Sequence, residues 1–260
     1  MRCSYTRLLI IGMALFVMLH CSQPTPFYQS VKIISTDTSI SYLEFDSLNT
    51  NYLTHSFTWE FWFRVGDLTQ DSPCLLMVPD AENNNDLAIF IDRSTGKTLT
   101  VFFANNQLTA GSAVNLLDGR FHSLALANDD TSRLTLFVDG SRRLVKNHSW
   151  QMNPTGNNIL IGGDWDPGQV TPDNGWTGWL DEVRLWNTAL ADSELTYHGS
   201  HIEKLTQHYN PVLLGHLKGL WRFNTENKSL TSIVDEHPGG GERPGLIPRG
   251  DFQWTETAAR

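Results

Sequence analysis

The sequence predicts an all-β protein in which short antiparallel strands form a sandwich. Over residues 57–65, apolar side chains alternate with polar or aromatic ones, which is the period of a strand with one buried face. The same period appears at residues 182–186, where Val and Leu occupy the apolar positions. Turn-forming pairs such as Asp118-Gly119 and Asp139-Gly140 separate runs of this kind at intervals typical of a sandwich.

The remaining strands follow from the same pattern in chain order. Residues 42–45 form the first predicted strand, and a turn-rich loop leads to the strand at 57–65, whose odd-numbered residues are expected in the core. Further strands are predicted at residues 74–78, 87–92, 98–103, 121–127, 133–138, 143–146 and 217–224. Residues 234–245 have the composition of a loop, and the segment that starts at Asp251 is expected to add an edge strand.

One short helix is predicted, over residues 191–206. Asp192 and Glu194 fall in its first turn, where negative charge interacts favourably with the helix dipole. Its expected buried contacts are three apolar side chains: Leu195, Ile202 and Leu205.

Taken in order, these segments resemble laminin-G-like domains of the concanavalin-A-like type. The stretch from Gly178 to Leu195, GWLDEVRLWNTALADSEL, is similar to the closing strand and helix of such domains. Further similar pieces lie in the expected order at residues 56–65, 118–130, 134–140 and 159–163. The resemblance implies a two-sheet antiparallel jelly-roll sandwich over residues 31–225. It implies little about function, because this scaffold carries unrelated activities.

Net charge and the N-terminal segment limit the class of protein. The formal charge of the chain is −9, and it becomes about −11 without residues 1–20, which contain two arginines and no acid. Nucleic-acid binding needs a basic surface, so nucleic acid is not an expected partner. Residues 1–20 have the features of a secretory signal peptide, since a positive start precedes an apolar run that is too short for a membrane span.

Cys21 directly follows this segment, an arrangement that resembles the acylated cysteine of bacterial lipoproteins. Residues 21–30 would then be the lipidated cysteine and a tether that anchors the protein to the membrane of the bacterial cell envelope. Ordinary signal cleavage followed by secretion is the alternative. Beyond the jelly-roll domain, residues 226–260 are expected to form a C-terminal loop and edge strand. Cys74 lies in an apolar run and is expected to be a buried free thiol.

The sequence offers no motif for catalysis. Glucanases on this scaffold carry closely spaced acids on one strand, and no such string occurs here. Glu60 and Glu182 share their strand faces with Arg64 and Arg184, which favours a solvated, salt-bridged sheet face over an active site. The protein is therefore not expected to be an enzyme.

A structural calcium ion is a further expectation from the resemblance, whose members commonly hold one between an early loop and the closing strand. Asp46 and Asp181 occupy those two positions, and calcium binds carboxylate and carbonyl oxygens. Both residues also suit plain turn or capping roles. Residues 83–86 (NNND), together with Asp164, Asp166 and Asp173, are looser alternatives for the ion.

The loop at residues 162–179 is the best candidate for a ligand surface. It combines tryptophan with acids and amides, which suits sugars because the ring stacks on C–H groups while polar groups bind hydroxyls. The candidate contacts are Trp165, Asp166, Asp173, Asn174 and Trp176. The sequence therefore predicts a non-catalytic cell-surface module that binds glycan or an extracellular protein. Two alternatives stay open: a divergent polysaccharide hydrolase or lyase, and a purely structural envelope lipoprotein.

Overall fold

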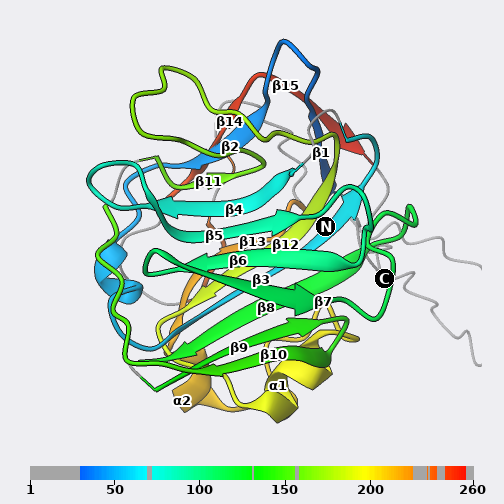
Figure 1. The fold of residues 1–260 in the computed structure, drawn as a ribbon. Helices are drawn as coiled ribbons and strands as arrows, with labels where there is room; N and C mark the ends of the chain where they lie inside the picture. The colour runs from blue at the N-terminus through cyan, green and yellow to red at the C-terminus, as the bar shows by residue number, and fades with distance from the viewer. Residues whose placement is uncertain are drawn as a thin grey trace, which may run out of the picture.

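Two antiparallel sheets pack face to face in the computed structural model (Figure 1), which describes residues 30–68, 72–130, 132–155, 158–224, 233, 235–238 and 244–255. The eight-stranded sheet has the order β10-β9-β8-β3-β12-β1-β15, and β13 also pairs with β12. The seven-stranded sheet has the order β14-β2-β11-β4-β5-β6-β7. This confirms the predicted two-sheet antiparallel sandwich.

The strands of the eight-stranded sheet are β1 (Ser30–Ile34), β3 (Phe57–Val65), β8 (His122–Asp129), β9 (Arg133–Val138), β10 (Ser141–Asn147), β12 (Gly178–Trp186), β13 (Leu217–Trp221) and β15 (Asp251–Thr255). Those of the seven-stranded sheet are β2 (Tyr42–Phe45), β4 (Cys74–Pro79), β5 (Asn85–Ile91), β6 (Thr98–Phe103), β7 (Asn106–Gly111), β11 (Leu160–Ile161) and β14 (Leu246–Arg249). The helices described are α1 (Asp192–His198), α2 (Pro211–Leu214) and the short 3-10 helix η1 (Thr50–Tyr52).

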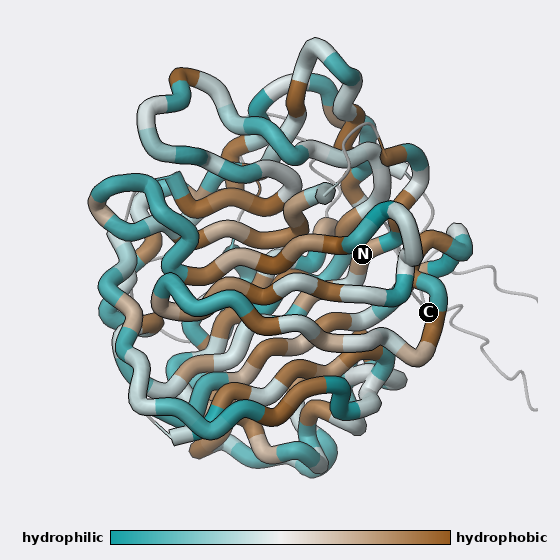
Figure 2. Tube along the Cα trace, viewed as in Figure 1, coloured by the Kyte–Doolittle hydropathy of each residue, from teal (hydrophilic) through white to brown (hydrophobic). Residues whose placement is uncertain are grey.

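The main core lies between the sheets and is built from alternate strand residues. On β3 the odd-numbered side chains enter it, with Trp59 fully buried as the alternation predicts. Hydrophobic residues follow the strands and hydrophilic ones the loops (Figure 2). Strands β1, β7, β11 and β14 were not predicted from the sequence pattern. The predicted C-terminal edge strand is present as β15, which pairs with β1.

The predicted helix at residues 191–206 is shorter than expected. It ends at His198, and Gly199 follows where α1 meets the β9–β10 turn: a Cβ on Gly199 would lie 2.1 Å from the backbone nitrogen of Gly140. The following residues form a loop and then α2, which the sequence pattern did not predict. In Figure 1 both helices lie beside β9 and β10, at one end of the molecule.

Residues 187–216, which carry both helices, form a cover segment over the outer face of the eight-stranded sheet. Leu190 and Leu195 pack with Trp186 and strand residues in a second hydrophobic cluster. As a result, Glu60 is 1 % exposed and Arg184 is fully buried. The expectation of a solvated, salt-bridged face is therefore wrong for this part of the sheet, because the cover segment excludes water from it.

Inside this interface the buried charges are paired. Nδ1 of His198 on α1 lies 2.8 Å from Oε2 of Glu60, and the indole N–H of Trp186 donates to Oε1 of Glu60 at 2.6 Å. Arg184 donates to the carbonyl of Ile202 and lies 3.4 Å from a carboxylate oxygen of Glu182. The contacts of His198 and Ile202 fasten the cover segment to the sheet. The charge pairing predicted for this sheet face is present, but solvation is not.

Among the described residues, no helix has the length and hydropathy needed to cross a membrane. Cys74 is a buried free thiol, as predicted. Cys21 and the predicted signal segment lie outside the described residues.

Candidate functional site

The candidate site lies on the outer face of the seven-stranded sheet, where a long loop follows β11. We call residues 164–174 of this loop the acid loop. Its two ends are held together by a β-bridge, in which the backbone N–H groups of Asp164 and Asp173 each donate to the other residue's carbonyl at 2.9 Å. The carbonyl of Asn174 accepts a hydrogen bond from the Cys74 N–H at 2.7 Å, which ties the loop to β4. The sheet thus positions the loop.

Three carboxylates meet on this loop, from Asp164, Asp166 and Asp173, and we call them the acid cluster. One oxygen from each lies within 4.8 Å of the others, a spacing that a single metal ion can bridge. The side-chain amide of Gln169 donates to Asp166 at 3.2 Å and to Asp173 at 3.0 Å. The Asn174 amide donates to the other oxygen of Asp173 at 2.9 Å.

Burial and mutual repulsion destabilise the ionised carboxylates of the acid cluster. Burial, followed by the neighbouring charges of Asp166 and Asp173, raises the pKa of Asp164 from 3.8 to about 7. Burial and the charge of Asp173 also raise the pKa of Asp166. A cation bound among these groups would oppose both effects, because it favours the ionised carboxylates.

Two oxygens at the acid cluster are buried and have no hydrogen-bond partner at that atom among the described residues: Oδ1 of Asp164 and Oδ1 of Asn85. Side-chain hydrogen bonds from Asn174 and Asn85 nevertheless favour the ionised Asp164 carboxyl. A buried polar atom without a protein partner is usually satisfied by an ion, a ligand or water. Oxygens beside further carboxylates are the donor set of a hard cation such as calcium.

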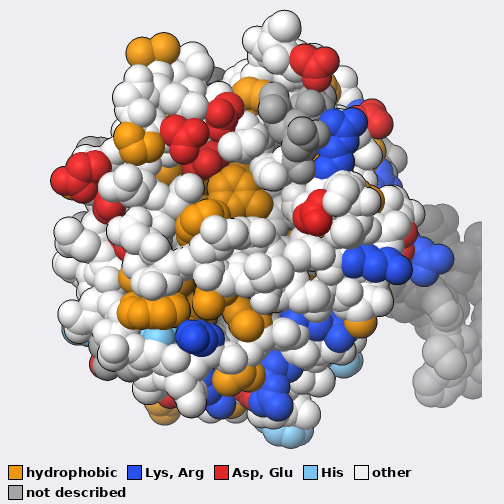
Figure 3. All heavy atoms as spheres, in the orientation of Figure 1, with side chains coloured by type: hydrophobic (Ala, Val, Ile, Leu, Met, Phe, Trp, Pro, Cys, Tyr) orange, Lys and Arg blue, Asp and Glu red, His pale blue; other side chains and the backbone are white. Residues whose placement is uncertain are grey.

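A cavity of about 430 Å³ adjoins the acid cluster, and we call it the aromatic pocket. Asp164, Asn174 and Asn85 lie at its acidic end. Its other walls come from Asp92, which directly follows β5, and from outward-facing residues of β5, β6 and β7: Phe90, Thr98, Thr100, Phe102, Gln107 and Thr109. In Figure 3, acidic side chains gather beside a hydrophobic patch on this face. Aromatic rings beside hydroxyls, amides and carboxylates are the usual surroundings of a bound sugar.

The structure brings together four of the five predicted ligand contacts. Trp165, Asp166, Asp173 and Asn174 all belong to the acid loop, and Trp165 packs on the hydrophobic patch formed by Cys74, Met77, Ala88, Phe90 and Phe102. Trp176 is fully buried, and its indole N–H donates to the Cys74 carbonyl at 3.0 Å. It has no surface with which to contact a ligand, so its predicted role is wrong: it anchors the loop in the core.

The two residues first assigned to calcium lie on different sheets. Asp46 follows β2, the neighbour of the edge strand β14 in the seven-stranded sheet. It is exposed and accepts a hydrogen bond from the Ser47 hydroxyl at 3.1 Å. Asp181 lies on β12 in the eight-stranded sheet, opposite Trp62, and is buried. Its neighbour Leu180 faces the core between the sheets, so Asp181 faces away from the other sheet.

From the sequence, Asn85 and Asp164 were only alternative positions for the calcium ion, and the pocket residues of β5 to β7 were not predicted. Asn85 is 79 positions from Asp164 in the chain, and only the fold brings them together. A signal for the aromatic pocket was present, however. Phe90 and Phe102 occupy the outward positions of strands whose inward positions are already filled by apolar residues.

Comparisons with known proteins agree with this fold. A protein-family model described as the concanavalin A-like lectin/glucanases superfamily matches residues 37–196. No curated protein matches the chain.

Among solved structures, a candidate carbohydrate-binding protein from Bacteroides ovatus is similar, with a TM-score of 0.62 and 16 % identity over 90 % of this chain. The match covers 61 % of that protein, so the chain corresponds to about three fifths of its length. A heptameric SAP-like pentraxin from Limulus polyphemus is similar with a TM-score of 0.56 and 13 % identity, over 68 % of this chain and 83 % of the pentraxin. At these identities the likeness concerns the fold. Since the family model spans more than half of its residues, the chain belongs to the concanavalin A-like lectin/glucanase superfamily.

Proposed function

We propose that the protein is a non-catalytic carbohydrate-binding module, and that it binds glycan in the aromatic pocket. The observation that carries this proposal is a pocket with aromatic side chains on one wall and, at its other end, the buried unpartnered oxygens of Asp164 and Asn85. A sugar ring could stack on Phe102, which is partly exposed, while Thr100, Gln107 and Asn174 hydrogen-bond its hydroxyls. The similarity to a candidate carbohydrate-binding protein is consistent with this role.

We further propose that a calcium ion binds at the acid cluster. Asp164, Asp166 and Asp173 would supply carboxylate oxygens, and the unpartnered Oδ1 of Asn85 is a further oxygen close to them. When bound, the ion would offset two of the three carboxylate charges of the acid cluster and offer open coordination positions to sugar hydroxyls. The acid loop then presents its polar groups to the pocket in a fixed arrangement.

The calcium proposal predicts a gain in stability that depends on Asp164. A ligand at a hundredfold excess over its Kd stabilises the folded state by about 2.7 kcal/mol, so calcium should raise the melting temperature by several degrees and chelator should reverse the rise. Asp164→Asn should abolish this shift, and Asp181→Asn is the matched control. A shift that survives Asp164→Asn but is lost in Asp181→Asn would place the ion at the position first predicted, beside Asp181.

The pH dependence of calcium binding follows from the raised pKa of Asp164. Without metal, the folded protein holds this proton up to about pH 7 whereas the unfolded chain loses it near 3.8. This group's contribution to stability therefore falls as the pH rises between those values. Calcium must displace the proton, so its affinity should fall about tenfold per pH unit below about pH 7. A calorimetric titration at pH 5, 6, 7 and 8 measures this, and a constant affinity would contradict it.

The burial of the acids on the eight-stranded sheet supports a non-catalytic role. Glu60, Asp181 and Glu182 on the outer face of the eight-stranded sheet are 1 %, 2 % and 2 % exposed and cannot reach a polysaccharide. A glycan array with and without chelator tests the binding function, and binding to none of the glycans would favour the structural alternative or a protein partner. Reducing-sugar release from mixed polysaccharides would show the hydrolase alternative to be correct.

We also propose that the module is held at the bacterial cell envelope by a lipid on Cys21. Cys21→Ser should release the protein from the membrane fraction and abolish acyl labelling, because stable anchoring needs the acyl chains that such processing adds. Unchanged membrane retention of this variant would rule the anchor out and leave simple secretion.

A further inference from the structure

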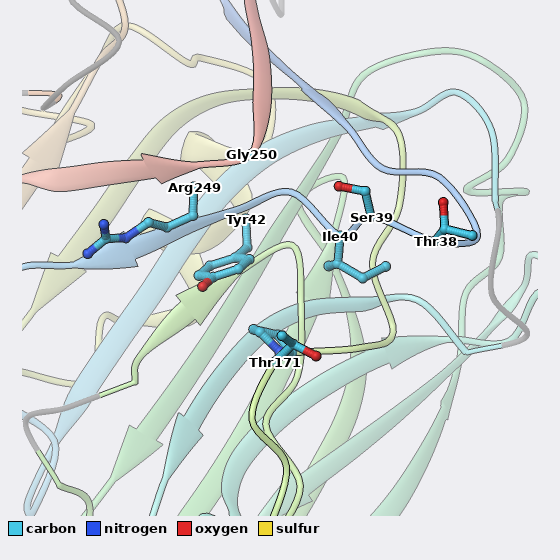
Figure 4. Close-up of a pocket in the computed structure, with 8 residues that line it drawn as sticks. Thr38, Ser39, Ile40, Tyr42, Thr171, Arg249 and Gly250 are labelled. Atoms are coloured by element: carbon cyan, nitrogen blue, oxygen red, sulfur yellow. The ribbon is translucent and has the colours of Figure 1, made fainter.

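A second cavity, of about 330 Å³, lies on the other side of the acid loop, and we call it the hydroxyl pocket (Figure 4). It is lined by Thr38, Ser39, Ile40, Tyr42, Thr171, Pro172, Arg249 and Gly250. These residues come from the β1–β2 connection, the start of β2, the acid loop and the β14–β15 turn. In Figure 4 Tyr42 and Ile40 lie above Thr171, whereas the Arg249 guanidinium extends away from them.

The walls of the hydroxyl pocket are fixed by tight packing. Gly250 has a φ of +98°, and a Cβ there would lie 2.4 Å from the hydroxyl oxygen of Ser41. That buried hydroxyl donates to the Ile34 carbonyl at 2.7 Å and accepts from the Asp251 N–H at 2.8 Å. The turn between β14 and β15 is therefore held in place against β2, which fixes this side of the pocket.

The hydroxyl pocket shares a wall with the acid loop. The side chain of Ile40 fills the space above Gly175, where a Cβ would lie 2.7 Å from it. A Cβ on Gly163 would likewise meet Pro172 at 3.4 Å and Ile40 at 3.6 Å. Thr171 and Pro172, which line the pocket, directly precede Asp173 of the acid cluster. Binding that fixes the conformation of the acid loop therefore also fixes the position of one wall of the hydroxyl pocket.

Strand register places the two pockets along one row across the sheet. Arg249 is paired with Tyr42 at one end, while Phe90 is paired with Thr100 and Thr100 with Thr109 at the other. Tyr42, Phe90, Thr100 and Thr109 face away from the core, because neighbours along their strands are buried in it. Strand β5 is three strands away from β2 in the sheet, which corresponds to a distance of about 14 Å between the two strands. A single sugar cannot occupy both pockets, whereas an oligosaccharide can.

Charge indicates which sugars fit. The one cation of the hydroxyl pocket, Arg249, is already paired, with its Nε 2.7 Å from a carboxylate oxygen of Glu44. Its other polar side chains are the neutral hydroxyls of Thr38, Ser39, Tyr42 and Thr171. Burial, together with the charge of Glu44, raises the pKa of Tyr42, which keeps this phenol neutral. Three carboxylates with one calcium ion leave a net negative charge between the pockets, which disfavours anions, so the row suits sugars without carboxylate or sulfate groups.

We infer that the hydroxyl pocket is a second subsite, which binds a distant unit of the same uncharged oligosaccharide that occupies the aromatic pocket. This inference rests on the proposed carbohydrate-binding function and adds to it the length and charge class of the ligand. Tyr42 would stack on the sugar, and Thr171 would hydrogen-bond it from the acid loop.

The test measures affinity against oligosaccharide length. A panel of starch, xylan, mannan, pectin and chondroitin sulfate first identifies the polysaccharide that binds best. Its mono- to hexasaccharide fragments are then titrated into the protein by calorimetry, in the presence of calcium. An uncharged polysaccharide should bind best, and affinity should rise about tenfold or more once a fragment spans both pockets. Tyr42→Ala and the near-isosteric Thr171→Val should remove this rise and leave the affinity for short fragments unchanged.

Two controls separate this inference from the proposed function. Phe102→Ala, in the aromatic pocket, should weaken short and long fragments alike, and Tyr209→Ala, on the exposed cover segment, should change neither. Three outcomes would overturn the second subsite alone. In the first, affinity does not change with fragment length. In the others, neither hydroxyl-pocket variant changes the binding of long fragments, or the protein prefers pectin or chondroitin sulfate. Binding to none of the polysaccharides would overturn the proposed function as well.

Discussion

Replacement of Trp59 by Ala is expected to lower the free energy of unfolding by roughly 3–5 kcal/mol, and replacement of Trp62 by a comparable amount. Trp59 is fully buried between the sheets and packs edge-on against Phe45, with ring centroids 5.4 Å apart. Trp62 points to the opposite face and would be expected from the alternation to cost clearly less. In the structure it is only 5 % exposed and packs against Arg184, whose guanidinium carbon lies 4.8 Å from its ring centroid.

Urea denaturation of the two variants measures these losses. Tyr209→Ala is the control, since that side chain is 84 % exposed and its removal should change stability by less than about 0.5 kcal/mol. A loss in Trp62→Ala that is much smaller than in Trp59→Ala would mean that the cover segment does not stay packed on the sheet in solution.

Replacement of Glu60 by Ala should cost roughly 3–5 kcal/mol, because it leaves the buried donors of His198 and Trp186 without their acceptor. Burial alone would raise the pKa of Glu60, but the charge and hydrogen bond of His198, followed by the charge of Arg184, lower it below 4.5. The stabilisation is therefore complete above about pH 4.5 and is lost as the pH falls through the lower folded value.

Glu44→Ala is the matched control for Glu60→Ala. Glu44 also forms an ion pair, but its partner Arg249 is half exposed, so the loss should stay below about 1 kcal/mol. The stability difference between wild type and Glu60→Ala should narrow as the pH is lowered below 4.5. A difference that stays constant down to pH 2 would contradict the assignment of Glu60 as a buried, ionised acceptor.

The sheets could be predicted from the sequence because their signal is local. Alternation along β3 and β12 marks one buried face, and turn pairs mark the strand ends. The cover segment has no such signal, since its buried leucines lie on a helix of seven residues and in loops without a regular period. For that reason the polar residues of β3 and β12 were assigned to a solvated face that the structure shows to be covered.

The candidate site could be predicted only where its residues are close in sequence. Trp165, Asp166, Asp173 and Asn174 lie within ten residues of one another, and a β-bridge brings the ends of their loop together. Trp176, two residues beyond, enters the core instead, and tryptophan chemistry suits both places equally. The contribution of β5 to β7 depends on pairing between distant strands, which composition and periodicity do not reveal.

The central claim is that glycan binds on the outer face of the seven-stranded sheet with the help of calcium at the acid cluster. The most direct measurement is calorimetric titration of wild type and Phe102→Ala with hexasaccharide from the best-binding polysaccharide, in calcium and in chelator. Wild type should bind in calcium, with affinity reduced at least tenfold by chelator and by Phe102→Ala. Binding of equal strength in all four titrations would contradict the claim, because neither the ion nor the aromatic pocket would then take part.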